Sequence, residues 1–193
     1  QSVSERCLSF IRLEDSSTRS VKLALDTGCT GIIVPRVDTK ETAEEIVNAA
    51  MYPPVGARSI GVCRSCQFGK TLPEAIAGDN NRVSVHVQIE HVDALDALDD
   101  IAQVSGIDGL FVGPYDLSGS VGKLGEVRDP EVQGMIQEVQ AISSKAGLVT
   151  GIFGRDAEAA KSYIDLGYSL IAVGTDTYYL SKSVQETLRS LRK

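Results

Sequence analysis

Short apolar segments rich in β-branched residues alternate along the chain with longer amphipathic segments. The apolar segments lie at 8–13, 31–37, 83–90, 109–113, 148–154 and 169–174. Segments with the spacing of amphipathic helices lie at 20–28, 39–52, 92–104, 130–147, 156–167 and 181–193. Continuous Val, Ile and Leu runs separated by helices indicate parallel strands buried on both faces. The pattern therefore predicts an α/β protein built from six βα units.

Residues at the predicted helix ends agree with this pattern. Thr39 can cap a helix whose first turn carries Glu41, and Pro130 stands at a first helical position. Glycines that can end a helix follow three of the segments, at Gly28, Gly147 and Gly167.

Two architectures use repeated βα units, an open doubly wound sheet and a closed (β/α)8 barrel. No G-x-G-x-x-G motif follows an early strand, as a dinucleotide-binding sheet would require. Polar residues instead end several strands, at Arg12, Glu90, Asp116 and Asp176. This spread favours a barrel, whose active site is assembled from many strand ends. Six βα units are two short of eight, so we expect this chain to form one incomplete barrel domain over 1–193.

Composition and charge exclude several classes of partner. The 193 residues are 42% apolar and 23% charged, with a net charge of −7, so a nucleic-acid backbone would be repelled. Aromatic residues make up 5%, and no segment is apolar enough for a membrane helix or a signal peptide. Four cysteines are too few for a disulfide framework. We therefore expect a cytoplasmic protein with neither nucleic-acid nor membrane partners.

The segment V-H-V-Q-I-E (85–90) is the strongest local indication of a functional site. Side chains alternate along a strand, so His86, Gln88 and Glu90 share the face opposite the apolar residues. The apolar face is expected to meet the helices, which leaves the polar face inside the barrel. A buried carboxylate is costly unless it is paired or bound to a cation. Glu90 therefore needs a partner.

Asp116 follows the next predicted strand at about one βα unit from Glu90. Neighbouring strands lie about 4.8 Å apart, so two carboxylates at adjacent strand ends can reach one ion. Such a pair suits a hard divalent cation such as Mg²⁺ or Mn²⁺. The alternative is that Glu90 pairs with an arginine and Asp116 caps a helix.

Arg12 and a glycine-containing turn supply candidate groups for an anionic substrate. An inward Arg12 at the rim could hold a keto or carboxylate oxygen, or form an ion pair with Glu90 or Asp15. The turn Gly113, Pro114 and Tyr115 could aim backbone N–H groups at an anion.

The motifs V-Q-I-E, G-P-x-D-L-S and A-V-G-x-D-T, in this order, resemble those of the HpcH/HpaI aldolase family. So do L-x-x-G-x-x-x-x-x-V-P-x-V at 25–37 and Y-P-P-x-G-x-R at 52–58. The resemblance runs over essentially the whole chain. It implies a metal-dependent class II pyruvate aldolase with a (β/α)8 barrel. Such an enzyme cleaves a 4-hydroxy-2-oxo acid to pyruvate and an aldehyde through a metal-stabilised enolate.

The resemblance also assigns roles to individual residues. It makes Glu90 and Asp116 the ligands of a divalent cation (Mg²⁺ or Mn²⁺, with Co²⁺ as a further candidate) and Gln88 a neighbour in the substrate pocket. Arg12 would bind the pyruvate oxygen and stabilise the enolate, and the backbone of 113–115 would hold the carboxylate. A homo-oligomer is implied as well, a trimer or a hexamer of paired trimers, with the helix at about 181–193 packed on a neighbouring subunit.

The sequence departs from the family ahead of Arg12. The family's first two strands carry an acidic residue and a catalytic His in a D-G-E-H-like motif, and nothing in this chain corresponds to them. The resemblance therefore implies that the chain holds the last six βα units of a (β/α)8 barrel, and we expect a fragment or a barrel completed by something else. His91 is interpreted as a helix-entry residue and His86 as a core residue, so neither is expected to replace the missing base.

Two other functions remain open at this point. One is a citrate-lyase-like enzyme acting on an acyl thioester, and the other is a non-catalytic partial barrel that serves as an oligomer subunit. The C-x-x-C pair Cys63 and Cys66 lacks a second pair or clustered histidines, so no zinc or redox role is expected for it.

Overall fold

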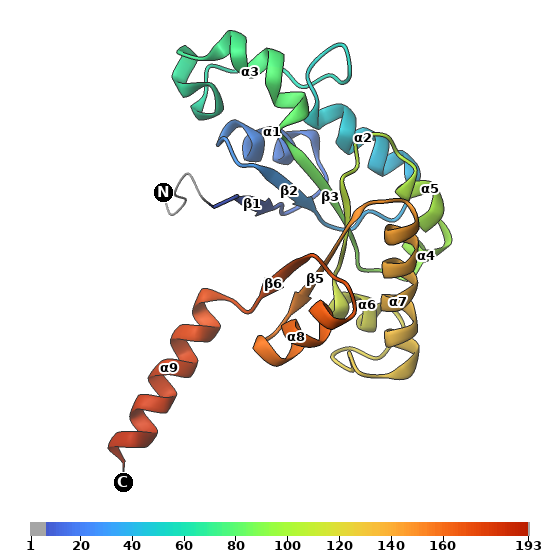
Figure 1. Ribbon diagram of the computed structural model, residues 1–193, viewed down its shortest axis with the longest axis vertical. Helices are drawn as coiled ribbons and strands as arrows, with labels where there is room; N and C mark the ends of the chain where they lie inside the picture. Colours follow the sequence, from blue (N-terminus) through green and yellow to red (C-terminus); the bar gives the residue numbers. More distant parts are fainter. Residues whose placement is uncertain (1–6, 193) are drawn as a thin grey trace.

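The computed structural model describes residues 7–192 and contains one curled sheet of parallel strands (Figure 1). The strands are β1 (Phe10–Arg12), β2 (Gly31–Val34), β3 (Ser84–Ile89), β4 (Gly109–Val112), β5 (Val149–Gly154) and β6 (Leu170–Val173). Their order in the sheet is β1-β2-β3-β4-β5-β6, and every neighbouring pair is parallel. Sequential parallel strands with helical crossovers are the barrel plan. The prediction of a partial (β/α) barrel with six strands is confirmed.

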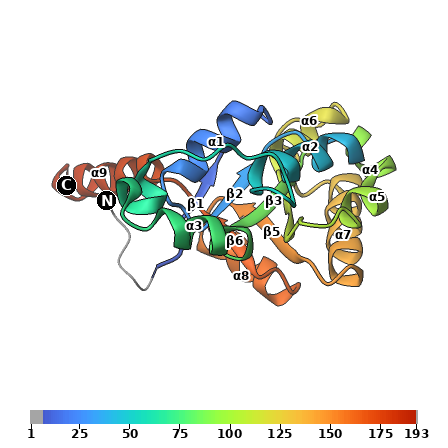
Figure 2. The ribbon, with the colours of Figure 1, turned by 90° about the horizontal axis from the view of Figure 1, so that it is seen from above.

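Except for the last one, which extends away from the sheet, the helices cover its convex side (Figures 1 and 2). They are α1 (Thr18–Asp26), α2 (Lys40–Ala50), α3 (Leu72–Gly78), α4 (Asp93–Asp96), α5 (Leu98–Ala102), α6 (Pro114–Ser120), α7 (Pro130–Lys145), α8 (Ala157–Asp165) and α9 (Asp176–Leu191). Two short 3-10 segments, η1 (Arg64–Gly69) and η2 (Asp79–Asn81), lie between α2 and β3.

The predicted capping residues act at the ends of α2 and α7. The Thr39 side chain accepts the backbone N–H of Thr42, and the Asp129 side chain accepts that of Glu131. These bonds satisfy N–H groups that the first turn of a helix leaves without a partner. The helix boundaries at these two places therefore follow from local chemistry.

Three predicted elements take another form in the structure, and the helix α3 (Leu72–Gly78) is not among those the sequence predicts. The helix expected at 92–104 is broken at Ala97 into α4 and α5. The turn expected at 113–115 is instead the entry of α6, because Pro114 occupies a first-turn position where no N–H is needed. The last helix begins at Asp176 rather than at 181, because Thr175 caps it by accepting the N–H of Tyr178.

The two faces of β3 pack against different surroundings. Val85, Val87 and Ile89 are fully buried in the apolar core that also contains helix residues. His86 and Gln88 are also buried, on the opposite, concave side of the sheet. The alternation predicted for this strand is therefore confirmed.

The concave face is tightly packed where His86 lies opposite Gly109 in the β3–β4 register. A Cβ on Gly109 would lie 2.6 Å from His86 Cε1 and 2.7 Å from the Val149 carbonyl oxygen. The His86 ring also meets Phe10 edge to face, with 5.2 Å between centroids. The absence of a side chain at Gly109 thus makes room for an imidazole in this layer.

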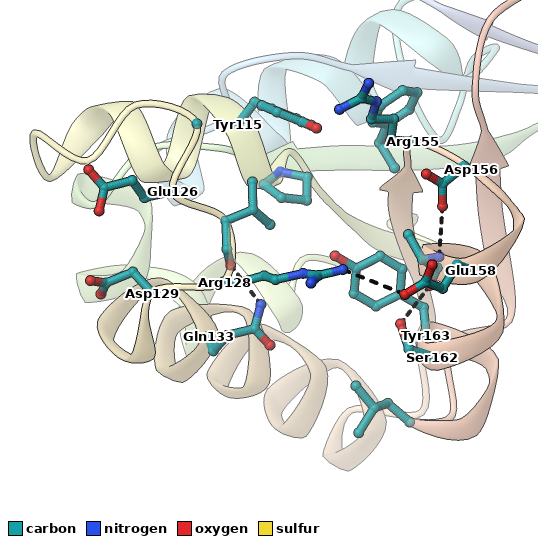
Figure 3. Close-up of a pocket in the computed structure, with 16 residues that line it drawn as sticks. Tyr115, Glu126, Arg128, Asp129, Gln133, Arg155, Asp156, Glu158, Ser162 and Tyr163 are labelled. Atoms are coloured by element: carbon teal, nitrogen blue, oxygen red, sulfur yellow. Dashed lines mark hydrogen bonds and ion pairs between the residues drawn. The ribbon is translucent and has the colours of Figure 1, made fainter. Parts of the chain in front are cut away.

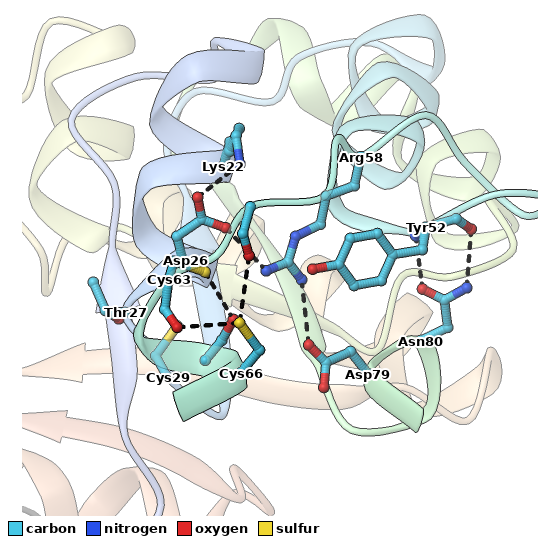
Figure 4. A network of polar contacts seen from close by, with 12 residues as sticks. Lys22, Asp26, Thr27, Cys29, Tyr52, Arg58, Cys63, Cys66, Asp79 and Asn80 are labelled. Carbon is cyan, nitrogen blue, oxygen red and sulfur yellow. Dashed lines mark hydrogen bonds and ion pairs between the residues drawn. The ribbon is translucent and has the colours of Figure 1, made fainter. Parts of the chain in front are cut away.

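A buried arginine holds the long segment between α2 and β3 against α1 (Figure 4). Arg58 is 3% exposed, and its guanidinium lies 3.3 Å from Asp26 and 3.9 Å from Asp79. It stacks 4.5 Å above the Tyr52 ring, and Asn80 binds both backbone groups of Tyr52. This network gives order to a segment that has no strand and little apolar patterning.

The two edge strands of the sheet each have one side without a neighbouring strand in the described chain, and the last helix has no buried residue. β1 and β6 are the edge strands, and α9 extends away from the sheet (Figure 1). Within α9 no residue is buried, although Leu180, Val184 and Leu188 are apolar. Among the described residues, no helix is long and apolar enough to cross a membrane.

We predict that Gly109→Ala destabilises the protein by about 1–3 kcal/mol, because the new methyl group collides with a buried ring and with a backbone carbonyl. Gly134→Ala is the matched control, since Gly134 lies within α7 and a Cβ there meets no atom within 4 Å. It should stabilise the protein by about 0.5–1 kcal/mol. Urea denaturation followed by circular dichroism measures both changes. Equal effects of the two variants would contradict this account of the concave face.

Candidate active site

A cavity of about 260 Å³ lies at the carboxyl ends of the strands. It is lined by Arg12, Ile33, Gln88, Phe111, Gly113, Pro114, Tyr115, Asp116, Phe153 and Ala172. Six of the seven residues that the sequence predicted for the site are among them. The carboxyl ends of the strands are where barrel enzymes place their active sites.

Glu90, the seventh residue, lies behind this lining and is 6% exposed. Its Oε2 accepts the Gln88 side-chain N–H at 2.6 Å, and its Oε1 accepts the Arg36 backbone N–H at 2.9 Å. Burial raises the pKa of Glu90, the Arg12 charge opposes this shift, and the Asp116 carboxylate adds to it. The Asp116 carboxylate is therefore near enough to Glu90 to contribute to the raised pKa of Glu90.

Arg12 connects the cavity to this buried carboxylate. Its Nε donates to Gln88 Oε1 at 3.2 Å, and its Nη1 donates to the Leu13 carbonyl oxygen at 3.1 Å. Its Nη2 lies 3.9 Å from Glu90 Oε1, at the outer limit of an ion pair. Asp15 instead accepts the Ser17 N–H, and no Arg12–Asp15 ion pair occurs among residues 7–192. Because the Arg12 side chain is 51% exposed, its guanidinium can still bind a substrate oxygen.

Gly113 allows the end of β4 to approach Gln88 and Glu90. A Cβ at this position would lie 2.6 Å from Gln88 Nε2 and 2.9 Å from Glu90 Cβ. Asp116 follows in the first turn of α6. The glycine thus brings the α6 entry, with its acidic residue, close to the Glu90 carboxylate.

The carboxylates suit a hard divalent cation that keeps open positions. Carboxylate oxygens are the ligands that Mg²⁺ and Mn²⁺ prefer. No group of three or more His, Cys, Asp or Glu residues that could hold a metal occurs in the described part of the chain. An ion at Glu90 and Asp116 would therefore leave several coordination positions to water and substrate.

The two histidines do not line the cavity. The His91 ring lies at the entry of α4, 3.1 Å from the Asp93 carboxylate, and its Nδ1 accepts the Asp93 N–H. His86 is fully buried, bonds to Ser84 Oγ at 2.9 Å, and has its pKa lowered by burial. Both therefore have the structural roles that the sequence indicated.

The C-x-x-C pair lies at η1, away from the cavity. Both thiols are free, and Cys66 Sγ donates to the Cys63 carbonyl oxygen at 3.2 Å. The absence of a zinc or redox role for this pair remains a prediction from the sequence.

A second, outer pocket of about 740 Å³ adjoins the cavity and includes Tyr115 in its lining (Figure 3). Pro114, Tyr115 and Phe153 line both spaces, and the rings of Tyr115 and Phe153 meet edge to face at 6.4 Å. The outer pocket is lined by four acidic residues and two basic residues, which are Glu126, Asp129, Asp156 and Glu158, and Arg128 and Arg155. The outer pocket is therefore more acidic than basic.

Sequence reasoning missed several residues of the cavity wall and one contact of Glu90. Ile33, Phe111 and Phe153 lie at inward positions in the strand register, so the alternation along each strand could have identified them. Arg36 gave no comparable indication, because its contact with Glu90 is made by the backbone.

Comparison with known proteins gives consistent matches over most of the chain. A family model described as HpcH/HpaI aldolase/citrate lyase matches residues 4–183. The hydroxypyruvate/pyruvate aldolase of Pseudomonas aeruginosa is 36% identical over 91% of this chain and 66% of its own length. The 5-keto-4-deoxy-D-glucarate aldolase of Klebsiella pneumoniae subsp. pneumoniae is 34% identical over 95% of this chain and 72% of its own length. The chain thus spans about two thirds of the length of these relatives.

Solved structures agree with the sequence matches. An HpcH/HpaI aldolase/citrate lyase family protein of Burkholderia cenocepacia J2315 superposes with a TM-score of 0.90 at 33% identity, covering 95% of this chain and 73% of that chain. An HpcH/HpaI aldolase of Desulfitobacterium hafniense DCB-2 gives 0.87 at 27% identity, covering 96% and 73%. Motifs, fold and comparisons lead to the same conclusion: the chain belongs to the HpcH/HpaI aldolase/citrate lyase family.

Proposed function

We propose that this chain forms the active site of a metal-dependent aldolase. The enzyme would cleave a 4-hydroxy-2-oxo acid to pyruvate and an aldehyde. The observation that carries the proposal is the cavity in which Arg12, Gln88 and Asp116 meet beside the buried Glu90. The matched relatives from Pseudomonas and Klebsiella are both named as aldolases, which supports the same reaction class.

Glu90 and Asp116 would hold the cation, Mg²⁺ or Mn²⁺ with Co²⁺ as a third candidate. When bound, the ion supplies Lewis-acid polarisation of the substrate's oxo group. The partly exposed Arg12 guanidinium would bind the same oxo oxygen and stabilise the negative charge that develops there during carbon–carbon cleavage. Gln88 hydrogen-bonds to both Arg12 and Glu90 and would hold their side chains in position relative to each other.

Other residues of the cavity would position the pyruvate part of the substrate. The backbone N–H groups that follow Gly113 and Pro114, beginning with that of Tyr115, belong to a first helical turn and lack intrahelical partners. We assign them to the substrate carboxylate. Ile33 and Phe111 line the same cavity and would exclude water from the reacting centre.

The two other functions are less well supported. An acyl-thioester lyase would need positive charge at the rim for its carrier's phosphates, whereas the outer pocket carries four acidic and two basic side chains. A non-catalytic subunit would not need a cavity that gathers six of the predicted site residues.

We also propose that the active protein is a homo-oligomer in which α9 packs on another copy. Leu180, Val184, Leu188 and Leu191 form one stripe along α9, and each is at least 45% exposed. β1 and β6 are open edges of the same sheet, and an open edge favours association. A trimer or a hexamer of paired trimers would bury these surfaces. We place this oligomer in the cytoplasm, where the four free cysteines would stay reduced.

We predict that Glu90→Gln and Asp116→Asn each weaken Mn²⁺ binding by more than about 100-fold, because each removes a charged ligand. Titration calorimetry measures the affinity in the intact protein. Deuterium entry into the methyl group of pyruvate, followed by NMR, should fall in parallel. Glu126→Gln is the matched control, since it neutralises a carboxylate of the outer pocket. A wild-type protein that neither binds Mn²⁺ nor exchanges pyruvate protons would disprove the proposed function.

Arg12→Lys separates catalysis from stability. If Arg12 stabilises the developing charge, kcat should fall by about 10²–10³ while the melting temperature changes little, since lysine keeps the charge but loses the planar fork. Arg128→Lys, at a side chain that is 93% exposed, should change neither quantity. Normal pyruvate proton exchange combined with a lower melting temperature in Arg12→Lys would make Arg12 a structural residue.

The assembly proposal predicts that the double variant Leu180→Asp/Val184→Asp dissociates the oligomer, because two charges would enter an apolar contact. Ser190→Asp, placed away from the stripe on the same helix, should leave the mass unchanged. Light scattering coupled to size exclusion measures the mass in solution. Monodisperse monomers of the wild-type protein would count against the proposal.

A further inference from the structure

Arg36 has a left-handed backbone conformation beside the active site. Its φ is 54°, and the other non-glycine residues of the described chain with positive φ are Gln67 and Phe68 in η1. Arginine gains nothing from this conformation, which favours Gly, Asn and Asp. A strained residue next to a functional site is a reason to ask what the strain provides.

The conformation directs two successive N–H groups toward the end of β3. The Arg36 N–H donates to Glu90 Oε1 at 2.9 Å, and the Val37 N–H donates to the Gln88 carbonyl oxygen at 3.3 Å. In an extended chain, successive N–H groups point to opposite sides, whereas a left-handed residue lets them point the same way. The positive φ therefore makes both bonds possible at once.

The Arg36 side chain is engaged elsewhere. Its Nε lies 2.6 Å from Asp38 Oδ2, and the side chain is 56% exposed. The bond to Glu90 comes from the backbone alone. With Gln88 Nε2 on the other oxygen at 2.6 Å, each Glu90 oxygen has one short N–H donor, one from Gln88 on β3 and one from the segment after β2.

We propose that Arg36 is a positioning residue whose strained backbone orients the Glu90 carboxylate toward the cavity. The inference rests on the proposed function only in taking Glu90 as a metal ligand. Partners that orient a ligand in this way typically change metal affinity by about 10–100-fold when lost. Residues that accept a positive φ should therefore be tolerated at position 36, and β-branched residues should not.

The experiment compares Arg36→Val with Arg36→Gly in the intact protein, using Mn²⁺ as the probe and calorimetry for its affinity. Valine disfavours the left-handed conformation, so Mn²⁺ affinity should fall by about 10–100-fold. Glycine keeps the N–H and accepts the conformation, so it should retain affinity to within about threefold. Gln67→Val is the matched control, since Gln67 has a φ of 50° but lies in η1. It should lower the melting temperature without changing Mn²⁺ affinity.

A second measurement does not depend on the metal. In the metal-free protein, the Arg36 amide should exchange with solvent at least about tenfold more slowly than in Glu90→Ala, because the mutation removes its acceptor. Equal losses of Mn²⁺ affinity in the glycine and valine variants would overturn the proposal, because they would assign the effect to the lost guanidinium group and not to the backbone conformation. An unprotected Arg36 amide would also overturn it. If the wild type binds no Mn²⁺, the proposed function fails, and amide exchange alone decides the role of Arg36.

Discussion

The arrangement of the active site depends on keeping one carboxylate, that of Glu90, inside the protein. Burying an ionised carboxylate costs several kcal/mol unless charges and hydrogen bonds compensate. Compensation comes from three strand ends: Arg12 on β1, the Arg36 amide after β2 and Gln88 on β3. The fourth neighbour, Gly113 after β4, contributes by having no side chain. A parallel sheet is what brings these four groups together, because its strands all end at the same edge.

The rest of the concave face is organised beneath this carboxylate in layers. His86 and Phe10 fill the layer below, and Gly109 leaves them room. Phe111 and Ile33 form the layer that faces the cavity. Close packing in both layers limits how far Gln88 can move, so a hydrogen bond of 2.6 Å to Glu90 is held by its surroundings. Rigid support of this kind is what a site needs when its groups must act together.

The molecule also has surfaces that its own chain does not cover. The apolar stripe of α9 and the two open sheet edges are exposed, whereas the outer surface over β2–β5 is packed by helices. The acidic outer pocket adjoins the cavity, and Pro114 and the rings of Tyr115 and Phe153 lie between the two spaces. Any molecule that reaches the cavity from this side must pass two aromatic rings, so their size bears on the substrate's aldehyde part.

Local patterns in the sequence predicted the strands, most helices and the barrel plan, and they indicated candidate residues for the site. Alternation placed His86, Gln88 and Glu90 on one face, and caps such as Thr39 marked helix starts. Other features arise only when the chain has folded. The ion pair of Arg12 with Glu90 at 3.9 Å and the Arg58 network join residues that are far apart in the chain. The left-handed conformation of Arg36 likewise accompanies contacts with the distant end of β3. Such contacts depend on how strands register and pack, which no local pattern encodes.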